Sequence, residues 1–292
     1  LRRRPTVLPH SAVTKEIIER ALQEDLGSGD LTTESIVSVD RQATATITAK
    51  TSGVVAGLFM VERTYHALDD GVSVETNVTE GQAVETGDLV AVVQGSAHSL
   101  LMGERTALNF LQRLSGTATR TRQFVEAVAG TRARVCDTRK TAPGLRVLDK
   151  YAVRAGGGTN HRLGLFDAVL IKENHLLAGG GISAAVEKAR KQIPHTAKVE
   201  VECESLSDVR EALNARADIL MLDNMPLAEM REAVELVAGR AVVEASGNVS
   251  LESVRAVAET GVDLISVGEL THSVKALDLS MRITVSGVCL RQ

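Results

Sequence analysis

Aromatic residues are nearly absent from this sequence. Among 292 residues there is no Trp, while Tyr and Phe occur two and four times, so aliphatic side chains must fill the interior. The 24 Gly and 5 Pro are too few for low-complexity disorder. The chain is long enough for two domains with separate cores, and an interior of Val, Leu, Ile and Ala favours parallel sheets covered by helices.

Cysteine and concentrated charge are scarce as well. Cys136, Cys203 and Cys289 are odd in number and far apart, which excludes a disulfide framework or a zinc motif and fits a reducing, cytoplasmic compartment. Cys136 and Cys203 are interpreted as packing residues. The net charge of −4 comes without long basic blocks and predicts no nucleic-acid partner. Arg2–Arg4 precede no apolar region and no segment could span a bilayer, so we predict neither a signal peptide nor a membrane span.

The second half of the sequence alternates short β-branched runs with segments of helical periodicity. Apolar residues recur at helical spacing in 182–193, 206–215, 227–237 and 251–259. Strands alternating with helices predict βαβ units and a parallel sheet. Six strands are two short of a complete barrel, so we predict an incomplete (β/α) barrel. The predicted strands are 133–137, 168–172, 198–202, 218–223, 241–246 and 263–268.

The first half of the sequence lacks this alternation of strands and helices and predicts a separate α/β domain. A long helical stretch begins near Ser99, and Ser115-Gly116-Thr117 is the expected join to the barrel. We therefore predict three parts: a domain over 1–115, the barrel over 116–275, and a C-terminal segment over 276–292 that packs back on the first domain. The other elements expected in the first half are helices over 14–26 and 59–68 and strands over 43–50, 72–78 and 89–93.

Each predicted barrel strand ends in a polar residue or a glycine. The C-terminal ends of the strands form the active site in β/α barrels, so six such endings together predict one site. The endings are Asp137, Lys172, Glu202, Asp223, Ser246-Gly247 and Gly268.

Basic residues are expected to converge at this end of the barrel. Several fixed cations in one cleft need a polyanionic ligand, either one with two adjacent carboxylates or a sugar carrying several phosphates. The alternative is a solvated basic face, which is disfavoured because the residues follow strands or lie in glycine-rich loops. The basic residues are Arg139, Lys140, His161, Arg162 and Lys172.

Two further features suit phosphate chemistry. Glu202 and Asp223 end neighbouring strands, where Mg²⁺ bridging a pyrophosphate prefers carboxylates, although they could instead form ion pairs with the basic cluster. The segments Ser246-Gly247-Asn248 and Val267-Gly268-Glu269 end the last two strands, where backbone N–H groups often bind a phosphate. Each segment alone would be an ordinary turn.

Several motifs combine these residues in a fixed order. The longest are Asp137-Thr138-Arg139-Lys140-Thr141-x-Pro143-Gly144 and Lys150-Tyr151-Ala152-Val153-x-x-Gly156-Gly157-Gly158-x-Asn160-His161-Arg162-x-Gly164-Leu165. Others are Ile171-Lys172-Glu173-Asn174-His175, Leu222-Asp223-Asn224, Glu244-Ala245-Ser246-Gly247 and Gly268-x-Leu270-Thr271-His272-Ser273. Together they closely resemble the quinolinate phosphoribosyltransferase family, and the resemblance extends over nearly the whole chain.

The resemblance implies a fold and a reaction. The fold is an N-terminal α/β sandwich with an incomplete barrel of six parallel strands. The reaction transfers the phosphoribosyl group of phosphoribosyl pyrophosphate to quinolinate with decarboxylation, giving nicotinate mononucleotide, pyrophosphate and CO₂ in NAD biosynthesis. The resemblance also implies Mg²⁺ as cofactor and a cytoplasmic homodimer or higher homo-oligomer.

The resemblance also implies roles for individual residues. Lys140, Lys172, Glu202 and Asp223 would be catalytic, with the two carboxylates near Mg²⁺-pyrophosphate, and Arg105 would reach the site from a partner subunit. Asn248 and Glu269 depart from the family pattern, which has Gly and a small residue there. The expected substrate-binding residues are Arg105, Thr138, Arg139, Lys140, His161, Arg162, Lys172, Glu202, Asp223, Ser246, Gly247, Asn248, Val267, Gly268 and Glu269.

Three alternatives stay open at this point. A related phosphoribosyltransferase would use nicotinate or another base, but a monocarboxylate needs fewer cations than the five found here. Look-alikes of the family are linked to molybdate transport. A lipoyl or biotinyl carrier would explain the hairpin-like stretch 78–93, but no lysine stands at a turn there to be acylated.

Overall fold

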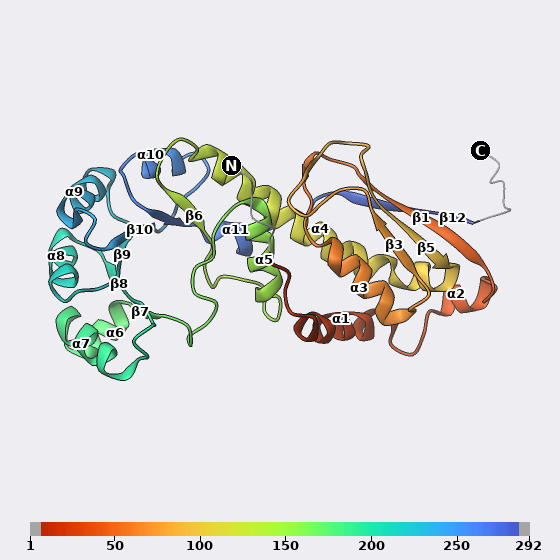
Figure 1. Cartoon of the computed structure of the whole chain (residues 1–292), viewed down its shortest axis with the longest axis horizontal. Coiled ribbons are helices and arrows are strands. Elements are labelled where there is room, and N and C mark those ends of the chain that lie inside the picture. Colours follow the sequence, from red (N-terminus) through yellow and green to blue (C-terminus); the bar gives the residue numbers. More distant parts are fainter. Residues whose placement is uncertain (1–6, 286–292) are drawn as a thin grey trace. The chain divides into compact units, whose positions relative to one another are not determined.

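The computed structural model describes residues 7–285 and confirms an α/β fold (Figure 1). Contacts divide it into two compact units. The N-terminal unit contains the chain up to Arg120, the segment Ala142–Gly157 and the chain from Val274 on; the barrel unit contains Thr121–Thr141 and Gly158–Ser273. Arg2–Arg4, Cys289 and the end of the predicted segment 276–292 lie outside the described residues. No helix within 7–285 combines the length and apolar character needed to cross a membrane.

Six parallel strands form the sheet of the barrel unit, which confirms the predicted incomplete barrel. Their spatial order is β6-β11-β10-β9-β8-β7, so β6 pairs with β11 and the edges of the sheet are β6 and β7. Because all six run in the same direction, their C-terminal ends share one side of the sheet. The strands are β6 (Arg134–Cys136), β7 (Val169–Ile171), β8 (Val199–Cys203), β9 (Ile219–Asp223), β10 (Val242–Ser246) and β11 (Leu264–Ser266).

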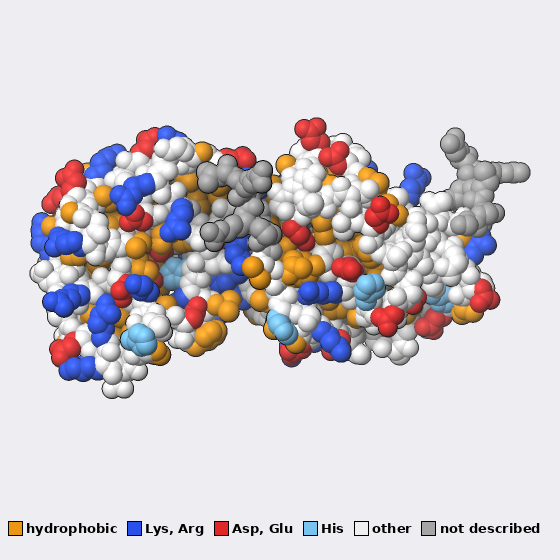
Figure 2. Space-filling model, in the orientation of Figure 1, with side chains coloured by type: hydrophobic (Ala, Val, Ile, Leu, Met, Phe, Trp, Pro, Cys, Tyr) orange, Lys and Arg blue, Asp and Glu red, His pale blue; other side chains and the backbone are white. Residues whose placement is uncertain are grey.

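Helices cover the outer face of this sheet (Figure 1). Val186, Val209 and Ala233 are buried against the strands, as the helical periodicity predicts. Figure 2 shows Lys and Arg interspersed with Asp and Glu over α7, α8 and α9, so the exposed faces of these helices carry both signs of charge. The helices on the outer face are α7 (Ile182–Gln192), α8 (Leu206–Asn214), α9 (Leu227–Val237) and α10 (Val254–Ala258). Two further helices follow strands directly: α6 (Glu173–Gly179) comes after β7, and α11 (Glu269–His272) comes after β11.

The N-terminal unit is built on a four-stranded sheet in the order β12-β1-β5-β3, with β2 and β4 as a separate pair. Strand β12 (Leu279–Val285) pairs antiparallel with β1 (Gln42–Ala49), so residues 279–285 complete this sheet. Small residues such as Ala45 and Ala91 let helices approach the sheet closely. The other elements are α1 (Ser11–Leu26), α2 (Leu31–Ile36), β2 (Gly53–Val54), α3 (Leu58–Leu68), β3 (Ser73–Thr76), β4 (Ala83–Val84), β5 (Leu89–Ser96) and α5 (Arg146–Gly156).

The predicted join at Ser115-Gly116-Thr117 is not a break in secondary structure. Helix α4 (Ala97–Ala127) continues through it. A Cβ atom on Gly116 would collide with the carbonyl oxygen of Lys275, so the glycine allows the segment after the barrel to cross the helix closely. The glycine that suggested a linker is therefore a packing residue.

Helix α5 (Arg146–Gly156) is absent from the predicted elements. The predicted range 116–275 includes it, yet α5 packs within the N-terminal unit. The ring of Tyr151 meets that of Phe59 edge-on at a centroid distance of 4.9 Å, and both rings belong to one apolar cluster. The buried carboxylate of Asp149 pairs with Arg113 at 3.1 Å. The segment 137–165 is rich in charged residues and glycine, which favours an interpretation as loops even though α5 itself is amphipathic.

Candidate active site

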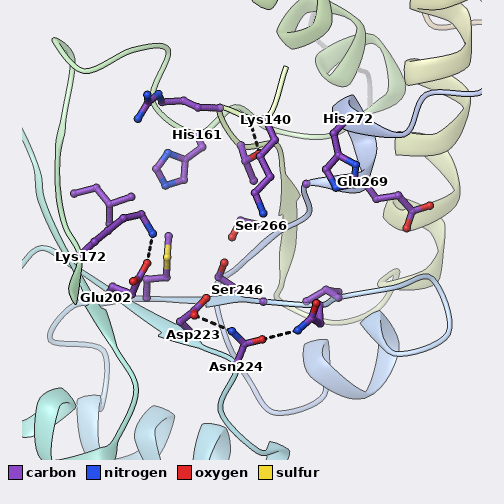
Figure 3. Close-up of a pocket in the computed structure, with 18 of the residues that line it drawn as sticks. Lys140, His161, Lys172, Glu202, Asp223, Asn224, Ser246, Ser266, Glu269 and His272 are labelled. Carbon is purple, nitrogen blue, oxygen red and sulfur yellow. Dashed lines mark hydrogen bonds and ion pairs between the residues drawn. The ribbon is translucent and has the colours of Figure 1, made fainter. Parts of the chain in front are cut away.

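A cavity of about 680 Å³ lies at the C-terminal ends of the barrel strands (Figure 3). All six strands, or the loops that follow them, contribute side chains to it, as the strand endings predict. Most of the predicted substrate-binding residues line the cavity. They are Thr138, Arg139, Lys140, His161, Arg162, Lys172, Glu202, Asp223, Ser246, Gly247, Asn248, Gly268 and Glu269.

Two predicted residues do not line this cavity. Arg105 is exposed on α4 in the N-terminal unit. Val267 is 1% exposed, and its backbone N–H donates to the carbonyl of Cys136 at 2.9 Å. That N–H is therefore already engaged by the chain, so the loop after β11 offers a ligand Gly268 and Glu269.

The cavity also contains residues with no predicted binding role. Asn224 directly follows β9, and Ser266 ends β11. The rule that the ends of the barrel strands form the site could therefore have identified both residues. Leu170 and Met221 lie inside strands, where an apolar residue looks the same whether it faces a cavity or a core. His272, which follows a strand and was expected near the site, lines the cavity. Val249 completes the set.

Arg162 and Arg139 bring like charges together in the cavity. One Arg162 amine nitrogen, Nη1, donates to the carbonyl of Ala168 at 3.0 Å, whereas its buried Nε has no hydrogen-bond partner in the described part of the chain. Burial, and then the charge of Arg139, lowers the pKa of Arg162 from its ordinary value. A bound anion would satisfy the buried N–H and offset the repulsion between the two guanidinium groups.

Lys172 does not stand alone in the cavity. Its amino group forms an ion pair with Glu202, drawn as a dashed line in Figure 3. Two roles were predicted for Glu202, a magnesium ligand or an ion-pair partner of the basic cluster. In this structure Glu202 forms the ion pair. The charge available to an anion is correspondingly smaller than five free cations would supply.

Lys140 extends into the cavity from the loop after β6 (Figure 3). The hydroxyl of Thr271 donates to the Lys140 carbonyl at 2.8 Å. A Cβ on Gly268 would lie 3.0 Å from Cδ of Lys140 and 3.1 Å from the His272 ring, so this glycine leaves room for both side chains. The Glu269 carboxylate points away from Lys172, Glu202 and Asp223 in Figure 3, so the departure from a small residue does not fill the cavity.

The loops after β9 and β10 are linked by side-chain amides. Asn224 donates to Asp223 at 2.8 Å, and Asn248 donates to Asn224 at 3.0 Å (Figure 3). Gly247 has a φ of 95°, and a Cβ there would collide with the Asn224 amide. Asn248 has a φ of 48°, a left-handed backbone that Asn tolerates better than most residues, which explains why it can stand where the family pattern has Gly.

Asp137 is a buried residue that supports the cavity without lining it. It is fully buried, whereas Lys172, Glu202 and Asp223 are at least partly exposed. One carboxylate oxygen accepts the backbone N–H of His161 at 2.9 Å, and the other accepts the amide of Asn160 at 2.6 Å. Asp137 therefore fixes the loop that carries His161 and Arg162.

Two buried carboxylates lie beneath His161. Its Nε2 is 3.0 Å from Glu200 and 3.7 Å from Glu244. Burial, and then the charge of Glu200, raises the pKa of Glu244 to about 7. Glu244 is therefore largely neutral below that pH.

Replacing Glu244 with Gln should make stability less dependent on pH. Because the pKa is near 4.5 in the unfolded chain and about 7 in the folded one, the wild type loses stability as pH rises between these values. Gln cannot ionise, so E244Q should unfold with a free energy higher by on the order of 3 kcal/mol at pH 8 and by less than about 1 kcal/mol at pH 5. Urea unfolding at both pH values measures this. An equal change at both would contradict it.

A magnesium site fits the open end of β8 and β9. Carboxylate oxygens of Glu202, Glu204 and Asp223 lie within 4.8 Å of one another. Oxygen ligands of this kind suit Mg²⁺, which usually takes one or two carboxylates together with substrate phosphates. The residues present therefore fit the predicted cofactor.

The two cysteines among the described residues are buried, and neither forms a disulfide bond there. Burial raises the pKa of the Cys203 thiol to about 12. A thiol that stays protonated is a poor nucleophile, which agrees with a packing role.

Both halves of the chain match one protein family. Residues 30–115 match "Quinolinate phosphoribosyl transferase, N-terminal domain", and residues 117–282 match "Quinolinate phosphoribosyl transferase, C-terminal domain". Together the two matches cover most of the sequence and include every residue that lines the cavity.

Individual relatives are similar over nearly their whole length. A Bacillus subtilis protein named "Probable nicotinate-nucleotide pyrophosphorylase [carboxylating]" is 45% identical over 272 residues, which cover 93% of this chain and 94% of the relative. A Nicotiana glauca protein named "Quinolinate phosphoribosyltransferase [decarboxylating] 2, mitochondrial" is 43% identical over 288 residues, which cover 92% of this chain and 82% of the relative. The crystal structure of NadC from Streptococcus pyogenes superposes with a TM-score of 0.93 at 42% identity, covering 96% of this chain and 99% of that one.

Proposed function

The chain belongs to the quinolinate phosphoribosyltransferase family, and we infer from this that it transfers the phosphoribosyl group of phosphoribosyl pyrophosphate to quinolinate. The reaction loses one carboxylate as CO₂ and yields nicotinate mononucleotide and pyrophosphate. The protein is accordingly a glycosyltransferase of the pentosyltransferase class, acting in pyridine nucleotide and NAD biosynthesis.

One observation supports this assignment most directly: the arginine pair in a cavity of sufficient size. Arg162 has a buried Nε without a partner among the described residues, and Arg139 repels it. Two adjacent ring carboxylates would offer acceptors to both guanidinium groups. We assign the quinolinate pocket to these arginines together with Thr138, Lys140, His161 and Lys172.

The charges in the cavity suit both chemical steps. The quinolinate nitrogen attacks the anomeric carbon of the ribose while the bond to pyrophosphate breaks and its electrons leave with pyrophosphate. The carboxylate next to the ring nitrogen then leaves as CO₂, and the electron pair left on the ring carbon takes a proton. Lys140, which extends into the cavity, would stabilise that developing negative charge, and Lys172 would orient the substrate after release from Glu202.

Glu202 and Asp223 are the proposed carboxylates of the magnesium site. When bound, Mg²⁺ supplies positive charge to the pyrophosphate group. Asp223 is positioned for this by the bond from Asn224, and the Glu202 carboxylate becomes available when Lys172 turns to the substrate.

The ribose phosphate is assigned to the loops after β10 and β11. Ser246, Gly247 and Asn248 form a turn whose left-handed backbone is held by the Asn224 amide. Gly268 presents backbone without a side chain beside them. A preformed turn loses little conformational freedom when it binds a phosphate.

The assembly is proposed to be a cytoplasmic homodimer or higher homo-oligomer. Arg105 is exposed on α4 and does not line the cavity of its own chain, which is compatible with a role in a partner subunit. The two buried cysteines form no disulfide bond within the described residues, which suits a reducing compartment.

A coupled assay tests the function. Purified protein, Mg²⁺ and phosphoribosyl pyrophosphate are incubated with quinolinate or with nicotinate, and mononucleotide, pyrophosphate and CO₂ are quantified. Equal amounts of the three products from quinolinate, with no turnover of nicotinate, are expected. Turnover of nicotinate, or of neither compound, would contradict the proposal.

A further inference from the structure

Both ring nitrogens of His161 have partners in the protein. The backbone N–H of Arg162 donates to Nδ1 at 2.7 Å. Nδ1 therefore acts as an acceptor, so the ring proton is on Nε2, which is 3.0 Å from the Glu200 carboxylate. This arrangement defines a neutral imidazole with Nε2–H donating to Glu200.

The ring of His161 joins Glu200 to the backbone of Arg162. Glu200 is the second residue of β8 and is 2% exposed, and its carboxylate lies 3.0 Å from the Nε2 atom of the ring. The other side of the ring engages the amide of Arg162. Asp137 holds the same loop through the backbone N–H of His161. A single buried acceptor thus influences both the ring and the arginine that follows it.

We propose that Glu200 is a positioning residue for carboxylate recognition, because it fixes the His161 ring and, through that ring, the backbone from which Arg162 reaches the ligand. This inference rests on the proposed function of the cavity. His161 then contributes a fixed, neutral ring to the lining of the cavity. The positive charge for the substrate carboxylates comes from Arg139, Arg162 and Lys140.

Glu244 provides a matched comparison. It lies on β10, is as deeply buried as Glu200, and is 3.7 Å from the same nitrogen, beyond hydrogen-bonding distance. Oε1 of each carboxylate lacks a hydrogen-bond partner among the described residues: in Glu200 it is the oxygen that does not bind His161, and in Glu244 it is the oxygen nearest to the ring. Glu244 instead interacts with the Ser266 side chain. Changes of equal size at the two positions therefore differ in which group loses its partner, the His161 ring for Glu200 and the Ser266 hydroxyl for Glu244.

Three variants test the proposal: Glu200→Met, Glu200→Gln and Glu244→Met. Met keeps the volume and removes the acceptor, whereas Gln keeps an acceptor and removes the charge. E200M is expected to raise the KM for quinolinate about 10- to 100-fold with the KM for phosphoribosyl pyrophosphate within about twofold, E200Q to restore most of the affinity, and E244M to behave like wild type. Equal losses in E200M and E244M, or a loss for both substrates, would reduce Glu200 to a structural residue and overturn the proposal.

A second measurement is independent of catalysis. Nitrogen NMR of the protein labelled at its histidines, with the His161 signals assigned by their loss in His161→Asn, reports which ring nitrogen carries the proton. One protonated and one unprotonated nitrogen are expected in wild type and E200Q, with altered signals in E200M. A doubly protonated ring in the wild type would overturn the proposal. If the wild type lacks the expected activity but shows this pattern, the assigned substrate is wrong while the geometry stands.

Discussion

Replacing Arg162 with alanine should lower kcat/KM for quinolinate by about a thousandfold, equivalent to roughly 4 kcal/mol. The guanidinium is partly buried, and its Nε lacks a partner among the described residues until an anion binds. Removing it leaves a substrate carboxylate without its guanidinium partner inside the cavity. Steady-state kinetics with each substrate varied in turn measures the effect, and the KM for phosphoribosyl pyrophosphate should change less than about threefold.

Two controls sharpen this result. Arg162→Lys keeps the charge but loses the fork that binds a carboxylate through two nitrogens, so it should recover only a small part of the activity. Arg231→Ala removes an exposed arginine from α9 that does not line the cavity, and it should leave activity unchanged. An R162A enzyme with nearly wild-type kinetics would exclude the arginine pair as the quinolinate site.

Replacing Asp223 with Asn should lower kcat about a hundredfold or more and raise the Mg²⁺ concentration needed for half-maximal rate. The change keeps the shape of the side chain at the end of β9 and removes only its charge. A neutral amide is a weaker ligand for a hard cation than a carboxylate is. Titration of the initial rate with Mg²⁺ at saturating substrates measures both effects.

Glu204 is the control for Asp223. Its carboxylate belongs to the same group of three, but it is exposed and does not line the cavity. Glu204→Gln should therefore keep the wild-type dependence on Mg²⁺. Equal weakening in E204Q and D223N would indicate a general loss of negative charge and would count against the assigned site.

The barrel and the location of its site could be predicted from the sequence. Short β-branched runs between helical patterns defined six strands, and parallel direction alone brings Lys172, Glu202 and Asp223 to one end. Helix α5 was not predicted because it lies in a segment rich in charged residues and glycine, which favours an interpretation as loops despite the amphipathic pattern of the helix.

The pairing of individual side chains could not be predicted. Lys172 and Glu202 have the same spacing whether they form an ion pair or bind substrate separately. Glu200 and Glu244 lie inside strands, where periodicity predicts burial but does not reveal a shared histidine neighbour. Such contacts depend on which side chain reaches across the barrel, and that information appears only when the strands are assembled.

The scarcity of aromatic residues has a consequence for optical spectroscopy. Tyr65 and Tyr151 are the only tyrosines, both are completely buried in the N-terminal unit, and there is no Trp. Tyrosine fluorescence therefore reports on that unit alone, whereas the barrel unit contains only the weakly emitting Phe124 and Phe166. A single Trp introduced at Phe166, an exposed ring four residues after Arg162, would observe ligand binding without a competing tryptophan signal.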